Sequence, residues 1–200
     1  MRVLVCGARG SVPTVGAGFT RVGGDTSCVA LAHDRAAPTL VLDAGTGLRR
    51  LARLLGAAPF RGAIVVGHLH WDHLWGLPFF PSGDRPDAVV RLLLPEQGAE
   101  PIELLGRAMA PPLFPITPSE LRGDWTFAAY DEGTFEAGGF TLHDLRIVRF
   151  EPQGITGAAI VGESHLTIHT WPEEGRAFVD IASCASPEGV DRALDAIEKA

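Results

Sequence analysis

Short apolar segments separated by glycine and proline turns run through the first part of the chain. The pattern predicts strands over 2–6, 27–33, 39–42, 63–66 and 89–94. The second and third strands flank a turn at 34–38, which is the spacing of a hairpin. A glycine-rich turn then leads into a predicted helix over 48–55, and a further helix is expected over 101–109 before a proline-broken loop at 111–118.

The pattern changes near Val148. A hairpin over 135–147 precedes this point, centred on two consecutive glycines at 138 and 139. Strands over 155–161, 165–170 and 177–181 follow it, and Pro187 opens a predicted last helix that runs to Lys199. The expected fold is a β-rich α/β fold, an α+β sandwich. It consists of two portions, 1–147 and 148–200, and the second has the order βββα.

Composition and charge exclude several classes of protein. The 200 residues carry 24 acidic and 17 basic side chains, a net charge of −7, which argues against a dedicated nucleic-acid binder. No apolar run approaches the roughly 18 residues of a membrane span, and the first residues do not have the pattern of a signal peptide. Three widely spaced cysteines, Cys6, Cys28 and Cys184, fit neither a disulfide framework nor a metal clip. These features predict a cytoplasmic protein with no membrane partner.

Three histidines and an aspartate lie within six positions directly after the strand predicted at 63–66. On an extended segment, residues two apart point to the same side, so His68 and His70 can hold one ion. Asp72 and His73, beyond the bend, would face a second ion beside it. Paired ions about 3.5–4 Å apart activate water and clamp a phosphate or an ester. The alternative is a polar loop in which the histidines bond to the backbone, and the spacing favours the metal site.

This histidine cluster belongs to a wider set of motifs that resembles the metallo-β-lactamase fold, in its ribonuclease Z-like and phosphodiesterase-like branch. The supporting segments are GARGSVP at 7–13, GGDTSC at 23–28 and LDAGTG at 42–47. The resemblance covers 1–147 and implies a hydrolase with one or two zinc ions, bound by His68 with His70 and by Asp72 with His73. Asp72 would also orient the attacking water. A nucleic acid would enter only as a substrate of this hydrolase.

The resemblance implies a site whose second half this sequence does not complete. The family supplies a third histidine, a bridging aspartate and a last histidine, but residues 148–150 read Val-Arg-Phe where the third histidine is expected. His143 is a candidate replacement that lies inside a predicted strand. Asp43 either orients a metal ligand through its carboxylate or simply forms a turn.

The segment GESHLTIHTWPE at 162–173 places a serine directly after an acidic residue. A serine at a turn can attack its own preceding carbonyl, and the resulting ester can eliminate to leave a pyruvoyl group. That carbonyl condenses with an amine and withdraws electrons as a carboxylate leaves. A histidine can move protons during the cleavage, and a cysteine can reprotonate the product. The composition of the segment also fits an ordinary strand with exposed polar residues.

The amino-acid sequence around this segment resembles that of the proenzymes of bacterial S-adenosylmethionine decarboxylase. The matching stretches are FEPQGITG at 150–157, ESHLTIHTWPE at 163–173 and VDIASC at 179–184. The resemblance covers about 148–200 and implies cleavage between Glu163 and Ser164, with Ser164 as the precursor of the pyruvoyl group. It also implies His169 as the processing histidine and Cys184 as the proton donor.

The same resemblance implies substrate contacts and a homodimer with its active sites at the interface between subunits. The implied contacts are Phe150 near the adenine, Thr156 in place of the usual serine, and Glu173 near the ribose. The first strand–helix unit of the decarboxylase is missing, and the hydrolase-like portion stands in its place.

The decarboxylase set of precursor serine, histidine and cysteine is complete, whereas the hydrolase set is present only in its first half. Because function follows the site rather than the fold, the predicted function is a pyruvoyl-dependent decarboxylase, a lyase of spermidine biosynthesis acting on S-adenosylmethionine. The alternatives are a metal-dependent hydrolase of a phosphodiester or an ester, and a non-catalytic fusion.

Overall fold

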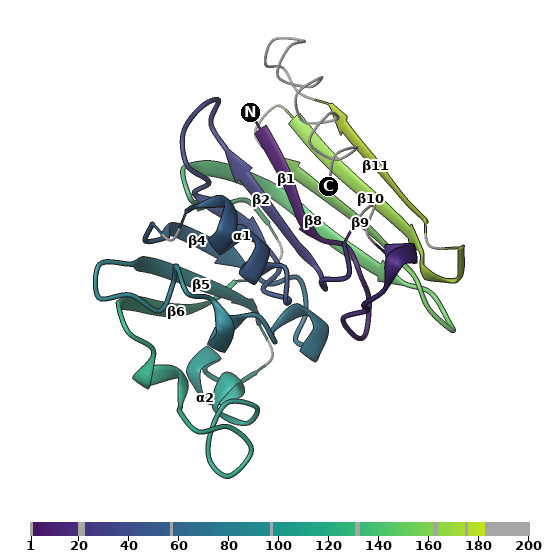
Figure 1. Cartoon of the computed structure of the whole chain (residues 1–200). Helices are drawn as coiled ribbons and strands as arrows, with labels where there is room; N and C mark the ends of the chain where they lie inside the picture. The colour runs from purple at the N-terminus through teal and green to yellow at the C-terminus, as the bar shows by residue number, and fades with distance from the viewer. Residues whose placement is uncertain are drawn as a thin grey trace.

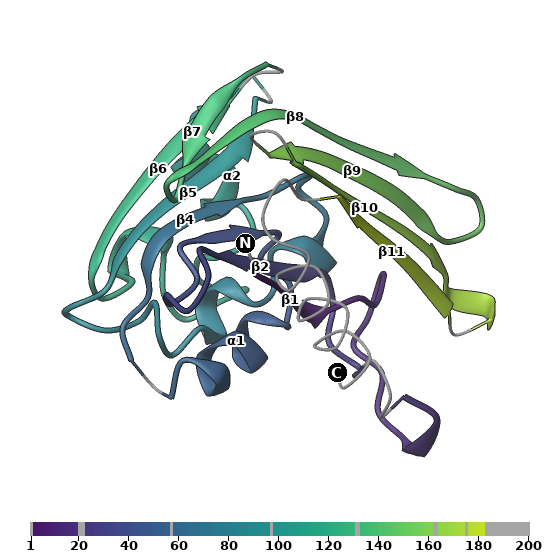
Figure 2. The ribbon, with the colours of Figure 1, turned by 90° about the horizontal axis from the view of Figure 1, so that it is seen from above.

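Two β-sheets lie face to face, and helices cover the outer side of the first sheet (Figure 1). The computed structural model describes residues 2–19, 23–56, 58–96, 98–130, 133–161, 164–174 and 176–182. Figure 2, seen from above, separates the two sheets and shows α1 on the side of the first sheet that faces away from the second. This arrangement confirms the expected α+β sandwich.

The first sheet has the strand order β1-β2-β3-β4-β5-β6. Its strands are β1 (Arg2–Gly7), β2 (Cys28–Ala32), β3 (Leu40–Leu42), β4 (Arg61–Val65), β5 (Val89–Pro95) and β6 (Asp124–Tyr130). The first three strands pair antiparallel, while β3, β4, β5 and β6 pair parallel. The helices are α1 (Leu48–Leu54) and α2 (Pro101–Gly106), with short 3-10 turns η1 (Ala17–Phe19), η2 (Trp71–His73), η3 (Leu77–Phe79), η4 (Pro118–Glu120) and η5 (Pro172–Glu174).

The second sheet is antiparallel throughout, in the order β11-β10-β9-β8-β7. Its strands are β7 (Phe135–Ala137), β8 (Phe140–Arg149), β9 (Ile155–Val161), β10 (Ser164–Trp171) and β11 (Arg176–Ala182). β8 runs unbroken through the boundary between 147 and 148, so no linker separates the two portions inferred from the sequence. The strands after 148 therefore pair with a strand of the front portion and not with each other alone.

Two apolar layers hold these elements together. Leu48 and Leu51 of α1 pack with Leu105 of α2 on one face of the first sheet. On the other face, residues of β1 to β5 pack against Leu142, Ala159 and other residues of the second sheet. Alternation along the strands explains this division, because successive side chains of a strand point to opposite faces.

Most predicted elements are confirmed, with two differences. The second helix ends at Gly106 rather than at 109, and β6 was not predicted at all. The helix expected over 187–199 lies outside the described residues. Cys6 and Cys28 are buried free thiols, as small apolar side chains would be. Among the described residues, no helix is long and apolar enough to cross a membrane.

Candidate functional site

The site lies where two parallel strands of the first sheet end. β3 and β4 are neighbours in register, with Leu42 opposite Val65, so the residues that follow them emerge at the same edge. Asp43 follows β3 directly, and His68 comes three residues after the end of β4. The short turn η2 then returns the chain toward this edge, because the backbone N–H of Ala44 donates to the carbonyl of His73 over 2.8 Å.

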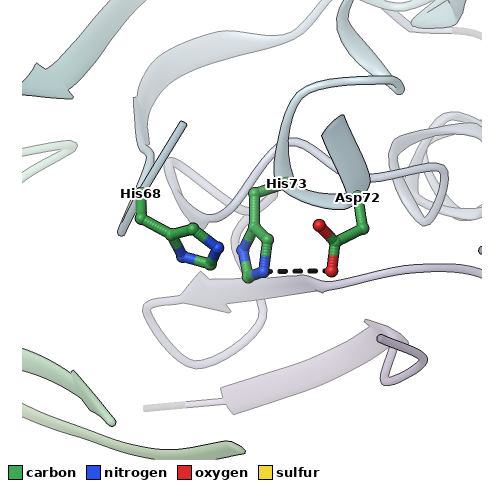
Figure 3. A group of neighbouring side chains, drawn as sticks. All are labelled: His68, Asp72 and His73. Atoms are coloured by element: carbon green, nitrogen blue, oxygen red, sulfur yellow. Dashed lines mark ion pairs between the residues drawn. The ribbon is translucent and has the colours of Figure 1, made fainter. Parts of the chain in front are cut away.

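His68, Asp72 and His73 form the centre of the site, as Figure 3 shows. Each offers one ligand atom, and these atoms all lie within 4.8 Å of one another. The rings of His68 and His73 are 3.7 Å apart between centroids. Both ring nitrogens of His68 are buried without a hydrogen-bond partner. A buried imidazole with no partner is costly in a folded protein unless something binds it, and a metal ion would do so.

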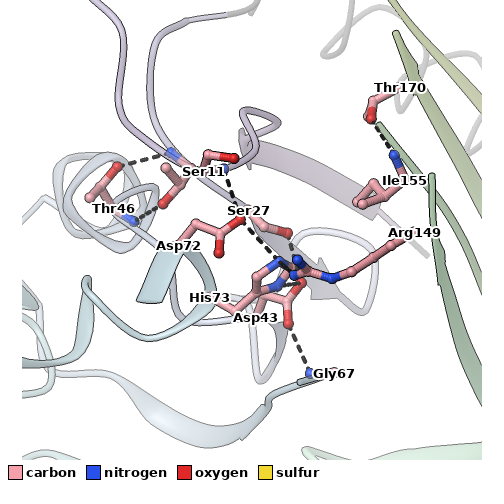
Figure 4. Close-up of polar contacts among 11 residues, drawn as sticks. Ser11, Ser27, Asp43, Thr46, Gly67, Asp72, His73, Arg149, Ile155 and Thr170 are labelled. Carbon is pink, nitrogen blue, oxygen red and sulfur yellow. Dashed lines mark hydrogen bonds and ion pairs between the residues drawn. The ribbon is translucent and has the colours of Figure 1, made fainter. Parts of the chain in front are cut away.

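Asp43 fixes the orientation of His73. Its Oδ2 lies 2.7 Å from Nδ1 of His73 and accepts a hydrogen bond from the Ser27 hydroxyl over 2.7 Å (Figure 4). Its Oδ1 accepts from the backbone N–H of Gly67 over 2.9 Å. Because Nδ1 faces this carboxylate, Nε2 is the atom that His73 presents to Asp72. Asp43 was expected either to orient a metal ligand or to form a turn. The contact with His73 supports the first interpretation.

The loop before η1 positions Asp72. Its Oδ2 accepts a hydrogen bond from the backbone N–H of Ser11 over 2.9 Å and lies 3.4 Å from Nε2 of His73. Ser11 and Asp43 both have a positive φ, of 63° and 64°, which is uncommon for residues other than glycine. Gly45 lies so close to this segment that an added Cβ would be 2.4 Å from the carbonyl oxygen of Asp72.

Burial and charge separate the protonation states of the two histidines. Burial, together with the positive charges of His73 and Arg149, lowers the pKa of His68 to about 3. Burial also opposes protonation of His73, but its contacts with Asp43 and Asp72 outweigh burial and raise its pKa to about 9. Burial disfavours the charged form of Asp72, yet the hydrogen bonds from His73 and Ser11 lower its pKa. His68 therefore presents a neutral imidazole.

These residues fit a divalent metal ion such as zinc. Two imidazoles and a carboxylate are common zinc ligands, and a fourth position would remain for water. Such an ion would make hydroxide available near neutral pH. The grouping differs from the predicted pairs, because His68 joins Asp72 and His73, while His70 is exposed and lies outside the cluster. The rings of His70 and His68 are 4.8 Å apart between centroids.

Arg149 is a residue of this site that the sequence did not reveal. It ends β8 on the opposite sheet, and its Nη2 lies 3.5 Å from Nε2 of His73 (Figure 4). It stands where the family's third histidine was expected. His143, the candidate replacement, is exposed, and its Nδ1 lies 3.3 Å from the hydroxyl of Thr134. No short motif marks Arg149, because its contact joins residues 76 positions apart.

One cleft reaches the centre through Asp72, and a second lies beside Trp71 and Trp75 without a lining residue from the cluster. The first, of about 380 Å³, lies between the loop at 8–14 and the turn after β8, and its lining includes Arg9, Ser11, Asp72 and Arg149. The other, of about 700 Å³, is mainly apolar and is lined by Trp71 and Trp75 among others. The two tryptophans stack with ring centroids 5.4 Å apart and line this apolar cleft.

The second predicted site lies on β10. Ser164 is the first residue of the strand and pairs with Val161, while His169 pairs with Thr156. Nδ1 of His169 lies 2.8 Å from the hydroxyl of Thr156. Because five residues of continuous strand rise about 16 Å, Ser164 and His169 of one chain are far apart. Glu163 and Cys184 lie outside the described residues.

The three residues predicted to contact the substrate, Phe150, Thr156 and Glu173, lie in different parts of the structure. Phe150 is exposed and lines the 380 Å³ cleft, whose lining does not include Thr156 or Glu173. Thr156 lies on β9 beside His169, and Glu173 is exposed in η5. Among the residues that the structure describes, these three side chains do not line one common cleft.

Comparisons with known proteins identify the family. The sequence model of the S-adenosylmethionine decarboxylase family matches residues 129–200. The S-adenosylmethionine decarboxylase proenzyme of Prochlorococcus marinus (strain MIT 9313) is 48% identical over 61 residues, 30% of this chain and 49% of that protein. The proenzyme of Hydrogenobaculum sp. (strain Y04AAS1) is 33% identical over 93 residues, 46% of this chain and 69% of that protein.

The chain belongs to the S-adenosylmethionine decarboxylase family. Its membership rests on the C-terminal part, and the match begins at 129, earlier than the expected 148. The chain spans about a third to a half of the length of the curated relatives it matches first.

Solved structures confirm the metallo-β-lactamase fold. A structure described as a new diphosphatase from the PhnP family has a TM-score of 0.51 and 19% identity, covering 80% of this chain and 62% of that one. The metallo-β-lactamase fold protein YhfI from Bacillus subtilis has a TM-score of 0.49 and 15% identity, covering 79% and 58%. Because residues 1–147 are less than three quarters of the chain, the 80% match also includes residues after 147. At this identity the likeness describes the fold alone.

Proposed function

We propose that the chain is the precursor of a pyruvoyl-dependent decarboxylase that cleaves itself between Glu163 and Ser164. The observation that carries the proposal is the family match over 129–200, which includes this bond. The pyruvoyl carbonyl supplies an electron sink when a carboxylate leaves an amine-bearing substrate. S-adenosylmethionine, as a substrate of spermidine biosynthesis, is the substrate we propose. The cysteine spacing supports a cytoplasmic location.

The roles of the individual residues are part of this proposal. Ser164 attacks the carbonyl of residue 163, and Cys184 returns a proton to the product. Thr156 orients the ring of His169 through Nδ1, which leaves Nε2 to exchange a proton. Phe150 and Glu173 complete the contacts to the substrate, together with Thr156.

A second copy of the chain supplies His169 in this proposal. Within one chain His169 is about 16 Å from Ser164 along β10, too far for proton transfer. The face of the second sheet that carries His169 also exposes large apolar side chains, namely Ile160 (45%), Trp171 (43%) and Phe178 (57%). A second copy packed on this face would bury these side chains and bring its His169 into the interface between the copies. This supports a homodimer.

Intact mass tests the cleavage. The purified full chain, after prolonged incubation, is expected to yield a piece comprising residues 164–200 with a blocked amino end. Ser164→Ala removes the nucleophile and is expected to stay whole, while Thr167→Ala is a matched loss of a hydroxyl on the same strand and is expected to cleave normally. A wild-type chain that remains whole rejects the decarboxylase.

Mixing two inactive variants tests the source of the histidine. His169→Ala retains Ser164 but lacks the imidazole, and Ser164→Ala retains the imidazole but cannot be cut. If a second copy supplies His169, mixing the two after partial unfolding and refolding restores cleavage of the His169→Ala chain. If cleavage is not restored, although mixed dimers are detected by native mass spectrometry, a second copy does not supply the histidine.

A second candidate function is a metal-dependent hydrolase of a phosphodiester or an ester. The specific observation in its favour is His68, whose buried nitrogens have no partner beside Asp72 and His73. In this reading His68, Asp72 and His73 hold the ion, and Asp72 also orients a water molecule.

Metal content tests this candidate. The full chain is expected to retain zinc or manganese through gel filtration and to cleave an aryl phosphodiester. His68→Ala is expected to lose both the ion and the activity. His143→Ala, which removes an exposed imidazole outside the cluster, is the matched control and is expected to change neither. Protein that retains no ion after loading rejects the hydrolase.

A further inference from the structure

Arg149 brings a permanent positive charge to the His68–Asp72–His73 cluster from the opposite sheet. Its Nη2 is 3.5 Å from Nε2 of His73, and His73 has no other nitrogen to offer a metal because Nδ1 faces Asp43. A guanidinium stays protonated in proteins and has only donors, so it cannot act as a ligand. His73 therefore has one nitrogen, Nε2, for one ion, and a second ion beside it would lack this ligand and would face the guanidinium of Arg149.

The described residues also lack the ligands for a second ion. Among them, the group of His68, Asp72 and His73 is the one set of three histidine, cysteine or acidic side chains with a geometry suited to a metal. Asp43 is occupied by Ser27, Gly67 and His73. His70 is exposed and outside the group. These three side chains can hold one ion. A second ion would have to use the same three side chains as ligands.

The guanidinium of Arg149 also borders a cleft in which a ligand could bind. Arg149 lines the 380 Å³ cleft together with Asp72, so this cleft begins at the metal-binding residues. The cleft lining also includes Arg9, whose Nε donates to the carbonyl of Gly23 over 3.2 Å and whose guanidinium lies over the ring of Phe19. Planar guanidinium groups bind phosphate and carboxylate oxygens through two parallel hydrogen bonds.

We propose that the cluster holds one metal ion and that the guanidinium of Arg149 takes the position of the second cation. In two-metal sites the second cation clamps the anionic group that is attacked, and here Arg149 does so from the cleft for a ligand that carries a phosphate or a similar oxyanion. The inference rests on the metal-dependent candidate function and is independent of cleavage at Ser164.

Metal stoichiometry of the full chain tests this proposal without any measurement of activity. After loading with excess Mn²⁺ or Zn²⁺ and removal of unbound metal, the wild type is expected to hold one ion per chain. Arg149→Ala is expected to bind that ion at least tenfold more tightly in isothermal titration, because a neighbouring positive charge is removed. Arg176→Ala is the matched control. Arg176 lines the same cleft, but it is exposed and paired with Glu174, and the variant is expected to bind as the wild type does.

Inorganic phosphate is the probe for the anion. In the metal-loaded wild type, phosphate is expected to bind measurably, and Arg149→Ala is expected to lose at least tenfold in that affinity while Arg176→Ala does not. Two ions per wild-type chain, unchanged metal affinity in Arg149→Ala, or unchanged phosphate affinity would each overturn the proposal. A chain that binds two ions leaves the hydrolase standing, whereas a chain that binds none rejects both.

Discussion

At the scale of single residues, the metal-binding cluster depends on backbone positions that few residues adopt. Asp43 and Ser11 have positive φ values, and each directs a polar group at a candidate ligand. Strained positions of this kind persist where the surroundings fix them, and they concentrate at functional sites. The motif of histidines and aspartate could be read from the sequence because its members are close along the chain. Arg149 could not, because only the packing of the two sheets brings it to His73.

Asp43→Asn is expected to weaken metal binding about 10- to 100-fold, which is typical when a group that orients a metal ligand is changed. An asparagine tolerates the positive φ of this position, so the backbone is preserved. The loss arises because a neutral amide holds Nδ1 of His73 less firmly than the carboxylate 2.7 Å away. Competition with a chromogenic chelator measures the affinity. Asp144→Asn, an acidic side chain paired with Arg146 on β8, is the control for loss of charge. Equal affinity in the two variants would contradict the role of Asp43.

Asp84 and Arg122 give a prediction for pH. Hydrogen bonds from the Arg122 guanidinium, over 2.7 and 3.1 Å, hold the pKa of Asp84 below its usual range. A carboxyl group whose pKa is lowered on folding stabilises the protein above its unfolded pKa of about 3.9, and this contribution is lost as the pH falls below that value. The difference in free energy of unfolding between the wild type and Asp84→Asn is therefore expected to shrink between pH 6 and pH 3. Urea unfolding at a series of pH values measures it, and a constant difference would contradict the expectation.

At the scale of secondary-structure elements, the alternation of apolar and polar residues and the positions of turn residues were sufficient to predict most strands. β6 was not predicted, although Asp124 to Phe127 alternate between polar and apolar residues and the exposed and partly buried side chains alternate over the same stretch. Its content of Trp125, Phe127 and Tyr130 was the available signal, since aromatic residues favour strands. The pairing of β9 with β8 could not be predicted either. It follows from tertiary packing, in which the decarboxylase-like strands cover the apolar face of a sheet formed by the front portion.

Two truncations on the decarboxylase-like strands test whether they contribute to this core. Leu166 is 5% exposed and belongs to the layer between the sheets, so Leu166→Ala is expected to cost about 2–5 kcal/mol in the free energy of unfolding. Ile160 is 45% exposed on β9, and Ile160→Ala is expected to cost less than about 1 kcal/mol. Urea unfolding measures both. Similar small losses would mean that the second sheet does not pack on the first as described.

At the scale of the whole molecule, the match to the decarboxylase family and the fold shared with a solved structure fall in one sandwich. The decarboxylase match begins at 129, and the metallo-β-lactamase-like fold extends past 147, so the two resemblances overlap in β8. In this chain β8 is followed by antiparallel strands with one face in the core between the sheets, and both matches include these strands. The sequence indicated that the resemblance changes from one family to the other near residue 148. It did not indicate that the strands before and after this residue would form one sheet.

This shared sheet determines what the proposed cleavage at Ser164 would do to the molecule. The cut would separate β9 from β10 along the chain, yet the two strands remain paired from Ser164 opposite Val161 to His169 opposite Thr156. Leu166 also keeps the released piece attached to the core between the sheets. The cleaved protein is therefore expected to elute from gel filtration in one peak at the volume of uncleaved Ser164→Ala, and to resolve into residues 1–163 and 164–200 only in denaturant. Elution of the 164–200 piece on its own under native conditions would show that β10 is not held by the sandwich, because a strand paired and buried on this scale does not dissociate without unfolding its neighbours.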